Sequence, residues 1–189
     1  MPHFNYDWTS QNIELFNTTL AHLNGAPARG LEIGSFEGRS ALWFCENILT
    51  HPEARLICID TFVGSAEHSA AGIDCTSLLQ LFQSNTDSVK DKIRAKIGKS
   101  SDVLPLIAET FDFIYVDGSH DPRDVCLDGI LAWSLLKPGG VMIFDDFLWG
   151  GHLPVHKRPY VGINAFLSIH DKQFEILKSS YALAIRRHG

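Results

Sequence analysis

The sequence has no apolar run long enough to cross a lipid bilayer, which takes roughly 18 consecutive apolar residues. Its first residues, MPHFNYDWTSQN, lack the basic and then apolar segments of a secretory signal peptide. We therefore expect a cytoplasmic protein with no membrane partner. An excess of basic residues is also missing, since the formal net charge is −6. This balance argues against a nucleic-acid backbone as the main partner.

Cysteines are few and form no C-x-x-C pair; the four are Cys45, Cys58, Cys75 and Cys126. Three of them have apolar surroundings, which favours reduced thiols over a zinc site or a disulfide. The composition shows no low-complexity tract, and 189 residues are enough to bury a large core. We expect one domain over residues 1–189, with residues 1–28 as an N-terminal helical extension.

The strongest signal is the segment 111–146, FDFIYVDGSHDPRDVCLDGILAWSLLKPGGVMIFDD. Two apolar runs, 111–116 and 141–144, are joined by one segment of helical length, which predicts neighbouring parallel strands buried on both faces. The right-handed crossover rule places the carboxyl ends of both strands at the same edge of the sheet. Asp117, Asp145 and Asp146 follow these ends, so we expect three carboxylates to gather where open α/β sheets bind ligands.

A second signal is the turn Glu32-x-Gly34-x-x-x-Gly38, between a strand at 30–33 and a helix through 41–49. Glycine allows a close backbone approach to a ligand, and the helix start offers free N–H groups. The spacing differs from the G-x-G-x-x-G of dinucleotide-binding dehydrogenases. Asp60 ends the next strand, 55–59, where an acid can accept hydrogen bonds from ribose hydroxyls. Together the turn and Asp60 favour a nucleoside ligand.

The remaining segments complete an α/β pattern. We predict a helix over 10–23 capped by Ser10, a mobile loop or lid over 63–74, a strand at 93–97 and a helix over 102–108. We expect Asp121 to cap a further helix. The predicted buried face of that helix comprises Val125, Ile130, Trp133 and Leu136. Two short strands, 174–177 and 182–185, predict a terminal hairpin. The expected fold is a Rossmann-like, doubly wound, seven-stranded, mostly parallel sheet with a C-terminal antiparallel hairpin and helices on both faces.

With these motifs in place, the chain resembles the class I S-adenosylmethionine-dependent methyltransferases over nearly its whole length. That family has a seven-stranded sheet ending in such a hairpin, and its first motif matches Glu32-Ile-Gly-Ser-Phe-Glu-Gly38. The family often has glycine where Phe36 stands. Its ribose-binding acid corresponds to Asp60. The cofactor-binding residues that we expect are Glu32, Gly34, Ser35, Gly38, Ser40, Asp60, Thr61, Phe62, Ser100, Ser101 and Asp117.

The segments FDFIYVDGSH and LLKPGGVMIFDD look like a bacterial subgroup related to catechol-type and macrolide-sugar O-methyltransferases. In those relatives a divalent metal is held by residues that correspond to Asp117, Asp145 and Asp146. Catechol-type enzymes have asparagine at the position of Asp146, whereas the sugar enzymes have aspartate, as here. The position of the catechol-type catalytic lysine is taken by His120. The resemblance thus implies Asp117 and His120 as catalytic residues.

This resemblance implies methyl transfer from S-adenosylmethionine to a hydroxyl group of a small molecule. Mg²⁺ suits all-oxygen ligands and lowers the pKa of a bound hydroxyl, and carboxylates gathered without a cation repel. His120 is then a candidate general base. Structural roles also explain each residue: His120 can fix the Asp117 loop, the pair Asp145-Asp146 can cap a turn, and Ser101 can cap its helix.

Rival functions stay open at this point. The glycine turn and Asp60 also suit a nicotinamide-dependent oxidoreductase, and a non-catalytic S-adenosylmethionine-binding protein would share the fold. Trp149 and Tyr160 either line an acceptor pocket or anchor their loop by packing. The acceptor is a sugar, a phenol or another small metabolite. A homodimer to which the N-terminal helix contributes is compatible with the sequence.

Overall fold

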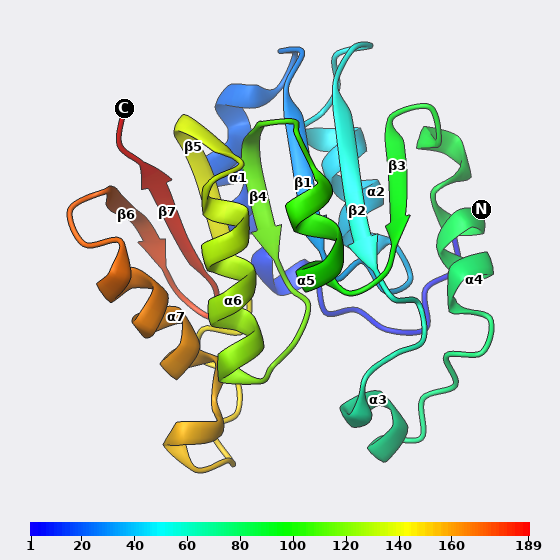
Figure 1. The fold of residues 1–189 in the computed structure, drawn as a ribbon. Coiled ribbons are helices and arrows are strands. Elements are labelled where there is room, and N and C mark those ends of the chain that lie inside the picture. Colours follow the sequence, from blue (N-terminus) through cyan, green and yellow to red (C-terminus); the bar gives the residue numbers. More distant parts are fainter.

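A seven-stranded sheet with the order β3-β2-β1-β4-β5-β7-β6 forms the centre of the computed structural model (Figure 1). The structure describes residues 1–189 apart from the side chain of residue 66. The parallel strands are β1 (Arg29–Ile33), β2 (Arg55–Asp60), β3 (Ile93–Ile97), β4 (Phe111–Val116) and β5 (Leu136–Phe144). The terminal strands β6 (Phe174–Ser179) and β7 (Leu183–Arg187) pair antiparallel, and β7 is also antiparallel to β5. The predicted fold class is confirmed.

Helices cover both faces of the sheet because successive strand residues point to opposite sides. In β4, Phe113 and Tyr115 belong to one apolar cluster and Ile114 and Val116 to the other. The first cluster packs against α1 (Ile13–Leu20), α2 (Arg39–Asn47) and α4 (Leu78–Asn85). The second packs against α6 (Pro122–Trp133) and α7 (Pro159–Ile169). Figure 1 shows α5 (Ser100–Val103), α6 and α7 in front of the sheet and α1 and α2 behind it.

Several element boundaries differ from the predictions. The helix expected over 10–23 is divided into η1 (Ser10–Asn12), α1 and η2 (Ala21–Leu23). The predicted cap by Ser10 is wrong, because Ser10 is the first residue of η1 and Thr9 precedes it at the cap position. The backbone N–H and Oγ of Ser10 donate to the Asp7 carboxylate. The helix expected over 102–108 is α5 followed by η4 (Leu104–Leu106), and Ser101 makes no side-chain cap. The remaining short helices are α3 (Ala66–Ala70), η3 (Asp87–Val89) and η5 (Val155–Lys157).

Helix α6 begins as predicted and buries Val125 and Trp133 of its predicted face, but not Ile130. The Asp121 side chain accepts a hydrogen bond from the Arg123 backbone N–H, and Pro122 follows it at the first helical position. Ile130, predicted as buried, is 38% exposed. The reason is a close helix approach at Gly129, where an added Cβ would lie 2.9 Å from the Phe166 ring. The residues that α6 buries are Val125, Asp128, Gly129, Ala132 and Trp133, while Leu136 is buried in β5.

The ends of β1, β2 and β4 are locked together where the strand order reverses direction. Gly34, after β1, donates its N–H to the Ile59 carbonyl at 2.8 Å, and Asp117 donates to the Ile33 carbonyl at 2.8 Å. A Cβ at Gly34, which has a φ of +84°, would lie 2.0 Å from the Asp117 carbonyl oxygen. Only glycine fits this turn without displacing backbone. Both predicted motifs therefore meet at the topological switch point of the sheet.

Two further expectations concern the chain as a whole. No helix of the described residues combines the length and the apolar character that crossing a bilayer takes. The four cysteines carry free thiols, and Cys45 and Cys58 are buried, as the sequence predicted.

Candidate active site

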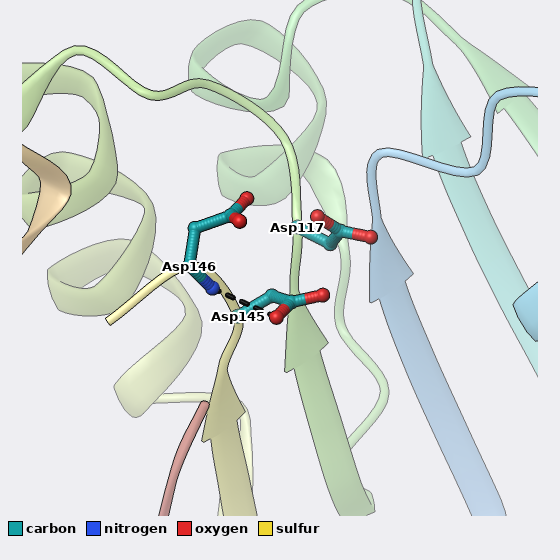
Figure 2. Close-up of side chains that lie close together, drawn as sticks. All are labelled: Asp117, Asp145 and Asp146. Carbon is teal, nitrogen blue, oxygen red and sulfur yellow. Dashed lines mark hydrogen bonds between the residues drawn. The ribbon is translucent and has the colours of Figure 1, made fainter. Parts of the chain in front are cut away.

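Three carboxylates meet at the carboxyl edge of the sheet. Asp117 follows β4, and Asp145 and Asp146 follow β5; one oxygen of each lies within 4.8 Å of the others (Figure 2). Ligands at 2.0–2.6 Å from one hard cation lie at most about 4–5 Å apart. The observed spacing therefore fits a shared cation after small side-chain shifts. The predicted gathering of the three acids is confirmed, while their role as metal ligands is an inference from their chemistry.

Asp145 is the most enclosed of the three acids, with 6% of its surface exposed. Asn12 donates from Nδ2 to both carboxylate oxygens at 2.9 and 2.8 Å, although the two residues are 133 positions apart. The Tyr115 hydroxyl and the Asp146 backbone N–H also donate to it. Burial, and after it the Asp146 charge, raise the pKa of Asp145 to about 6, against the effect of these donors. The N-terminal segment thus holds one of the acids in place.

Repulsion among the acids is visible at Asp117. Burial raises the pKa of the Asp117 carboxyl well above its ordinary value, and the charges of Asp145 and Asp146 raise it further. A bound cation or a cationic group of a ligand would oppose this shift, because it stabilises the charged forms. The electrostatics therefore suit a site that receives positive charge.

His120 connects this acid cluster to the opposite side of the site. Its Nε2 lies 2.7 Å from Asp146 Oδ2, and its Nδ1 contacts a carboxylate oxygen of Glu67 in α3. The Trp149 ring lies over the imidazole, with 4.2 Å between the ring centroids. Burial alone would lower the pKa of His120, but its contacts with Asp146 and Glu67 outweigh burial and raise it. The imidazole is thus held at the acid cluster by two carboxylates.

The glycine turn is built around two acids. Glu32 is fully buried and accepts hydrogen bonds from the hydroxyls of Ser35 and Ser40 at 2.5 and 2.6 Å. Burial raises the pKa of Glu32 to about 7. Asp60 accepts from the backbone N–H groups of Ser35 and Phe36 at 2.8 and 2.9 Å, and from that of Phe62 at 2.7 Å. These bonds fix the turn between β1 and α2 against the end of β2.

Phe36 occupies the position at which the family often has glycine, and the structure explains why glycine suits it. Its φ is +45°, a left-handed conformation that costs a residue with a side chain roughly 1–2 kcal/mol. The ring packs against Trp8 and His68, with centroid distances of 5.0 and 4.8 Å. Trp8 and His68 are themselves nearly parallel, 5.7 Å apart. This aromatic packing accompanies the strained turn.

One cavity of about 810 Å³ runs along the site, within the range of small-molecule pockets. The predicted site residues that line it are Gly34, Ser35, Ser40, Asp60, Thr61, Ser100, Ser101, Asp117, His120, Asp145 and Asp146. Glu32, Gly38 and Phe62 are not among its lining residues. Glu32 holds the turn through the Ser35 and Ser40 hydroxyls. A Cβ at Gly38 would lie 2.8 Å from the Thr86 side chain, and the Phe62 ring packs on Phe82. These three residues shape the turn.

Sequence reasoning missed several residues of the site. Asn12 and Asp128 lie in segments predicted to be packing helices, and Glu67 lies in the segment predicted to be a loop. The Tyr181 hydroxyl, from the turn after β6, donates to Asp146 Oδ1 at 2.8 Å. A signal existed for Asp128, an acid three residues after Val125 on the inward face of α6. The loop predicted over 63–74 contains α3, which brings Glu67 to His120. Trp149 lines the cavity, whereas Tyr160 packs on Phe147.

Comparisons with known proteins agree with this architecture. A family model described as "Methyltransferase domain" matches residues 31–147. The O-methyltransferase hkm8 of Aspergillus hancockii is 30% identical over 126 residues, 66% of this chain and 44% of that protein. The O-methyltransferase TomG of Streptomyces achromogenes, solved in complex with SAM, has a TM-score of 0.71 at 20% identity and covers 100% of this chain and 84% of its own. The MycE methyltransferase of mycinamycin biosynthesis, with Mg and SAH, has a TM-score of 0.66 at 15% identity, covering 97% of this chain and 51% of its own.

The family model spans more than half of the chain, so the chain belongs to this methyltransferase domain family. The prediction of a class I S-adenosylmethionine-dependent methyltransferase is thereby confirmed. This membership decides against the nicotinamide-dependent oxidoreductase. The chain spans 44% of the length of the curated fungal relative that it matches.

Proposed function

We propose that this protein transfers the methyl group of S-adenosylmethionine to a hydroxyl group of a small molecule, with a divalent cation, Mg²⁺, assisting. The observation that carries the proposal is the single cavity that joins the glycine turn and Asp60 to the cluster of Asp117, Asp145 and Asp146. Family membership supports the donor, since TomG was solved with SAM. Mg in the MycE structure supports the cation.

The residues of the turn suit an adenosyl cofactor. Asp60 already accepts from three backbone N–H groups, two on Oδ2 and one on Oδ1. Because a carboxylate offers about four acceptor positions, about one remains on Oδ1 for a ribose hydroxyl. Ser35 and Ser40 line the cavity beside it. Asp117, at the junction of the turn and the acid cluster, is suited to a cationic part of the cofactor. When bound, S-adenosylmethionine supplies an electrophilic methyl group on its sulfonium, and the cation supplies positive charge that acidifies the acceptor hydroxyl.

The chain's own contribution is to orient the acceptor and to remove its proton. Asp117, Asp145 and Asp146 offer only carboxylate oxygens, the donor set that Mg²⁺ prefers. Orientation of the hydroxyl behind the methyl group supplies much of the rate in such an in-line displacement. His120 Nε2 lies at the acid cluster and is our candidate to accept the hydroxyl proton once Asp146 turns from it toward the cation, while Glu67 holds the other nitrogen. The Trp149 ring packs on the imidazole and restricts its orientation.

A binding and turnover experiment tests the function. Isothermal titration calorimetry with S-adenosylmethionine measures cofactor binding, and transfer of labelled methyl to sugars, phenols and small hydroxy metabolites measures activity with and without a chelator. Failure to bind S-adenosylmethionine would contradict the proposal. Binding without transfer to any acceptor would favour the non-catalytic S-adenosylmethionine-binding protein considered from the sequence.

The His120→Ala variant tests the proposed base. We expect kcat to fall by about 10²–10⁴, the usual contribution of a well-placed general base. Cofactor affinity should change little, since the cofactor contacts lie at the glycine turn. His152→Ala is the matched control, because His152 is an exposed loop histidine that also contacts the Trp149 ring, edge to face. Unchanged turnover in His120→Ala would reject the assignment.

The cation is tested separately by thermal unfolding. A ligand that binds only the folded protein raises its melting temperature with concentration. We expect Mg²⁺ to stabilise the wild type and to stabilise Asp146→Asn much less, since one ligand loses its charge. Asp171→Asn, at an exposed position, should respond like the wild type. Equal responses of all three proteins would remove the metal from the mechanism.

A further inference from the structure

Helix α6 buries a carboxylate that the proposed mechanism does not use. Asp128 is 3% exposed and borders the cavity. Its Oδ1 accepts a hydrogen bond from the Ser100 hydroxyl at 2.5 Å. Oδ2 has no hydrogen-bond partner among the described residues, and it lies 3.5 Å from the point that a Cβ at Gly118 would occupy. One oxygen of a buried acid is thus left free beside the loop that follows β4.

An acid in this position is unfavourable by itself. Asp128 lies between Val125 and Ala132 on the inward face of α6, where apolar residues pack against the sheet. Burial raises the pKa of Asp128 to about 6, so most of it still carries a charge at pH 7. A buried charged acceptor without its full set of donors costs free energy. A hydrogen-bond donor supplied by a ligand in the adjoining cavity would offset that cost.

The location of Asp128 indicates which part of a ligand it would meet. Gly98, after β3, donates its N–H to the Asp60 carbonyl at 3.0 Å, so the end of β3 adjoins the proposed ribose site. Helix α5 starts next to it with Ser100, which binds Asp128. A nucleoside whose ribose contacts Asp60 and whose base points away from the acid cluster reaches this end of the cavity. Its base then lies beside Ser100, Ser101 and Asp128.

We infer that Asp128 selects the nucleobase of the cofactor, its free Oδ2 accepting a hydrogen bond from the exocyclic amino group of adenine. This inference rests on the proposed function, because it presumes an adenosyl cofactor in the cavity. A base with an oxo group at the same position presents an acceptor to the carboxylate, and two acceptors repel. Ser100 orients the carboxylate through Oδ1 and leaves Oδ2 for the base.

Paired binding measurements test the inference. Calorimetry gives the affinities of the wild type for S-adenosylhomocysteine and for S-inosylhomocysteine, whose bases differ in the 6-amino or 6-oxo group and in the hydrogen that N1 of the oxo base carries. We expect the wild type to prefer the adenosyl compound by about 10–100-fold, the usual effect of a hydrogen bond to a charged group. Asp128→Asn should reduce that preference at least about tenfold, since its amide is uncharged and can donate to the oxo group.

Two further variants separate recognition from packing. Asp124→Asn, one turn earlier on α6, changes an exposed acid that accepts only from Ser119 and should keep the wild-type preference. Ser100→Ala removes the hydroxyl but leaves the carboxylate, so most of the preference should remain. If Ser100 itself selected the base, this variant would lose the preference and the inference would be wrong.

The remaining outcomes are distinguishable. A wild type that binds both compounds equally overturns the role of Asp128, even if Asp128→Asn does not fold. A folded Asp128→Asn protein with the full wild-type preference overturns it as well and leaves only a packing role. A wild type that binds neither compound contradicts the proposed function together with this inference.

Discussion

Gly34 is the position at which a single methyl group should do the most damage to the site. Its φ of +84° costs an alanine roughly 1–2 kcal/mol. The added Cβ would also lie 2.0 Å from the Asp117 carbonyl oxygen and 2.6 Å from its carbon, neither of which is a movable side chain. The turn at Gly34 must then shift, which weakens the hydrogen bond of Gly34 to Ile59 and that of Asp117 to Ile33, each worth about 0.5–1.5 kcal/mol. We expect Gly34→Ala to lose about 2–5 kcal/mol of unfolding free energy.

Urea unfolding followed by circular dichroism measures this loss by linear extrapolation. Gly25→Ala is the matched control: its φ is +77°, but an added Cβ meets nothing within 4 Å, so it should lose only the conformational part, about 1–2 kcal/mol. The difference between the two variants isolates the clash at the switch point. Equal losses in both would refute the close packing of the two strand ends. Gly34→Ala should also weaken S-adenosylmethionine binding, whereas Gly25→Ala should not.

Two further predictions concern buried polar groups. Because burial raises the pKa of Glu32 from 4.5 to about 7, its protonation stabilises the folded protein fully below pH 4.5. This contribution, about 3 kcal/mol, is lost as the pH rises to 7. In urea unfolding at pH 4.5–8, the unfolding free energy of Glu32→Gln should therefore depend less on pH than that of the wild type. The same pH dependence in both proteins would contradict the raised pKa of Glu32. Asn12→Ala removes both donors from Nδ2 to Asp145 and should cost about 1–3 kcal/mol, while the exposed neighbour Gln11→Ala should be nearly neutral. Similar stability of both variants would show that the N-terminal segment does not hold Asp145.

Much of the fold was predictable because its signals are local. Strands β2, β4 and β5 each contain a short apolar run that an aspartate ends or follows, and the crossover rule then places their carboxyl ends at one edge. For this reason the sequence pattern is enough to predict that Asp117, Asp145 and Asp146 lie together. The requirement for glycine at position 34 was also predictable, although the physical reason for it differs from the expected one. We predicted that glycine allows a close approach of the backbone to a ligand. In the structure, it allows the close approach of the Asp117 carbonyl oxygen.

Errors arose where a contact outside the helical pattern decides the outcome. Ser10 did not cap its helix, because it lies inside the first turn, where Asp7 accepts hydrogen bonds from its backbone N–H and hydroxyl. Ile130 is exposed because the contact of Gly129 with Phe166 sets the rotation of α6. Neither competing contact can be read from helical periodicity. Helix faces in the sequence are therefore approximate until the neighbouring helix is placed.

The sequence alone determined the order of strands and helices, the glycine turn and the three acids at strand ends, since each depends on residues close together in the chain. Only the tertiary structure decided which side chains serve those acids. Asn12 reaches Asp145 from 133 positions away, and Glu67 reaches His120 from 53. Ser100 meets Asp128 across 28 positions. Such contacts depend on how the helices and loops pack at the carboxyl edge of the sheet, and no local pattern encodes that packing.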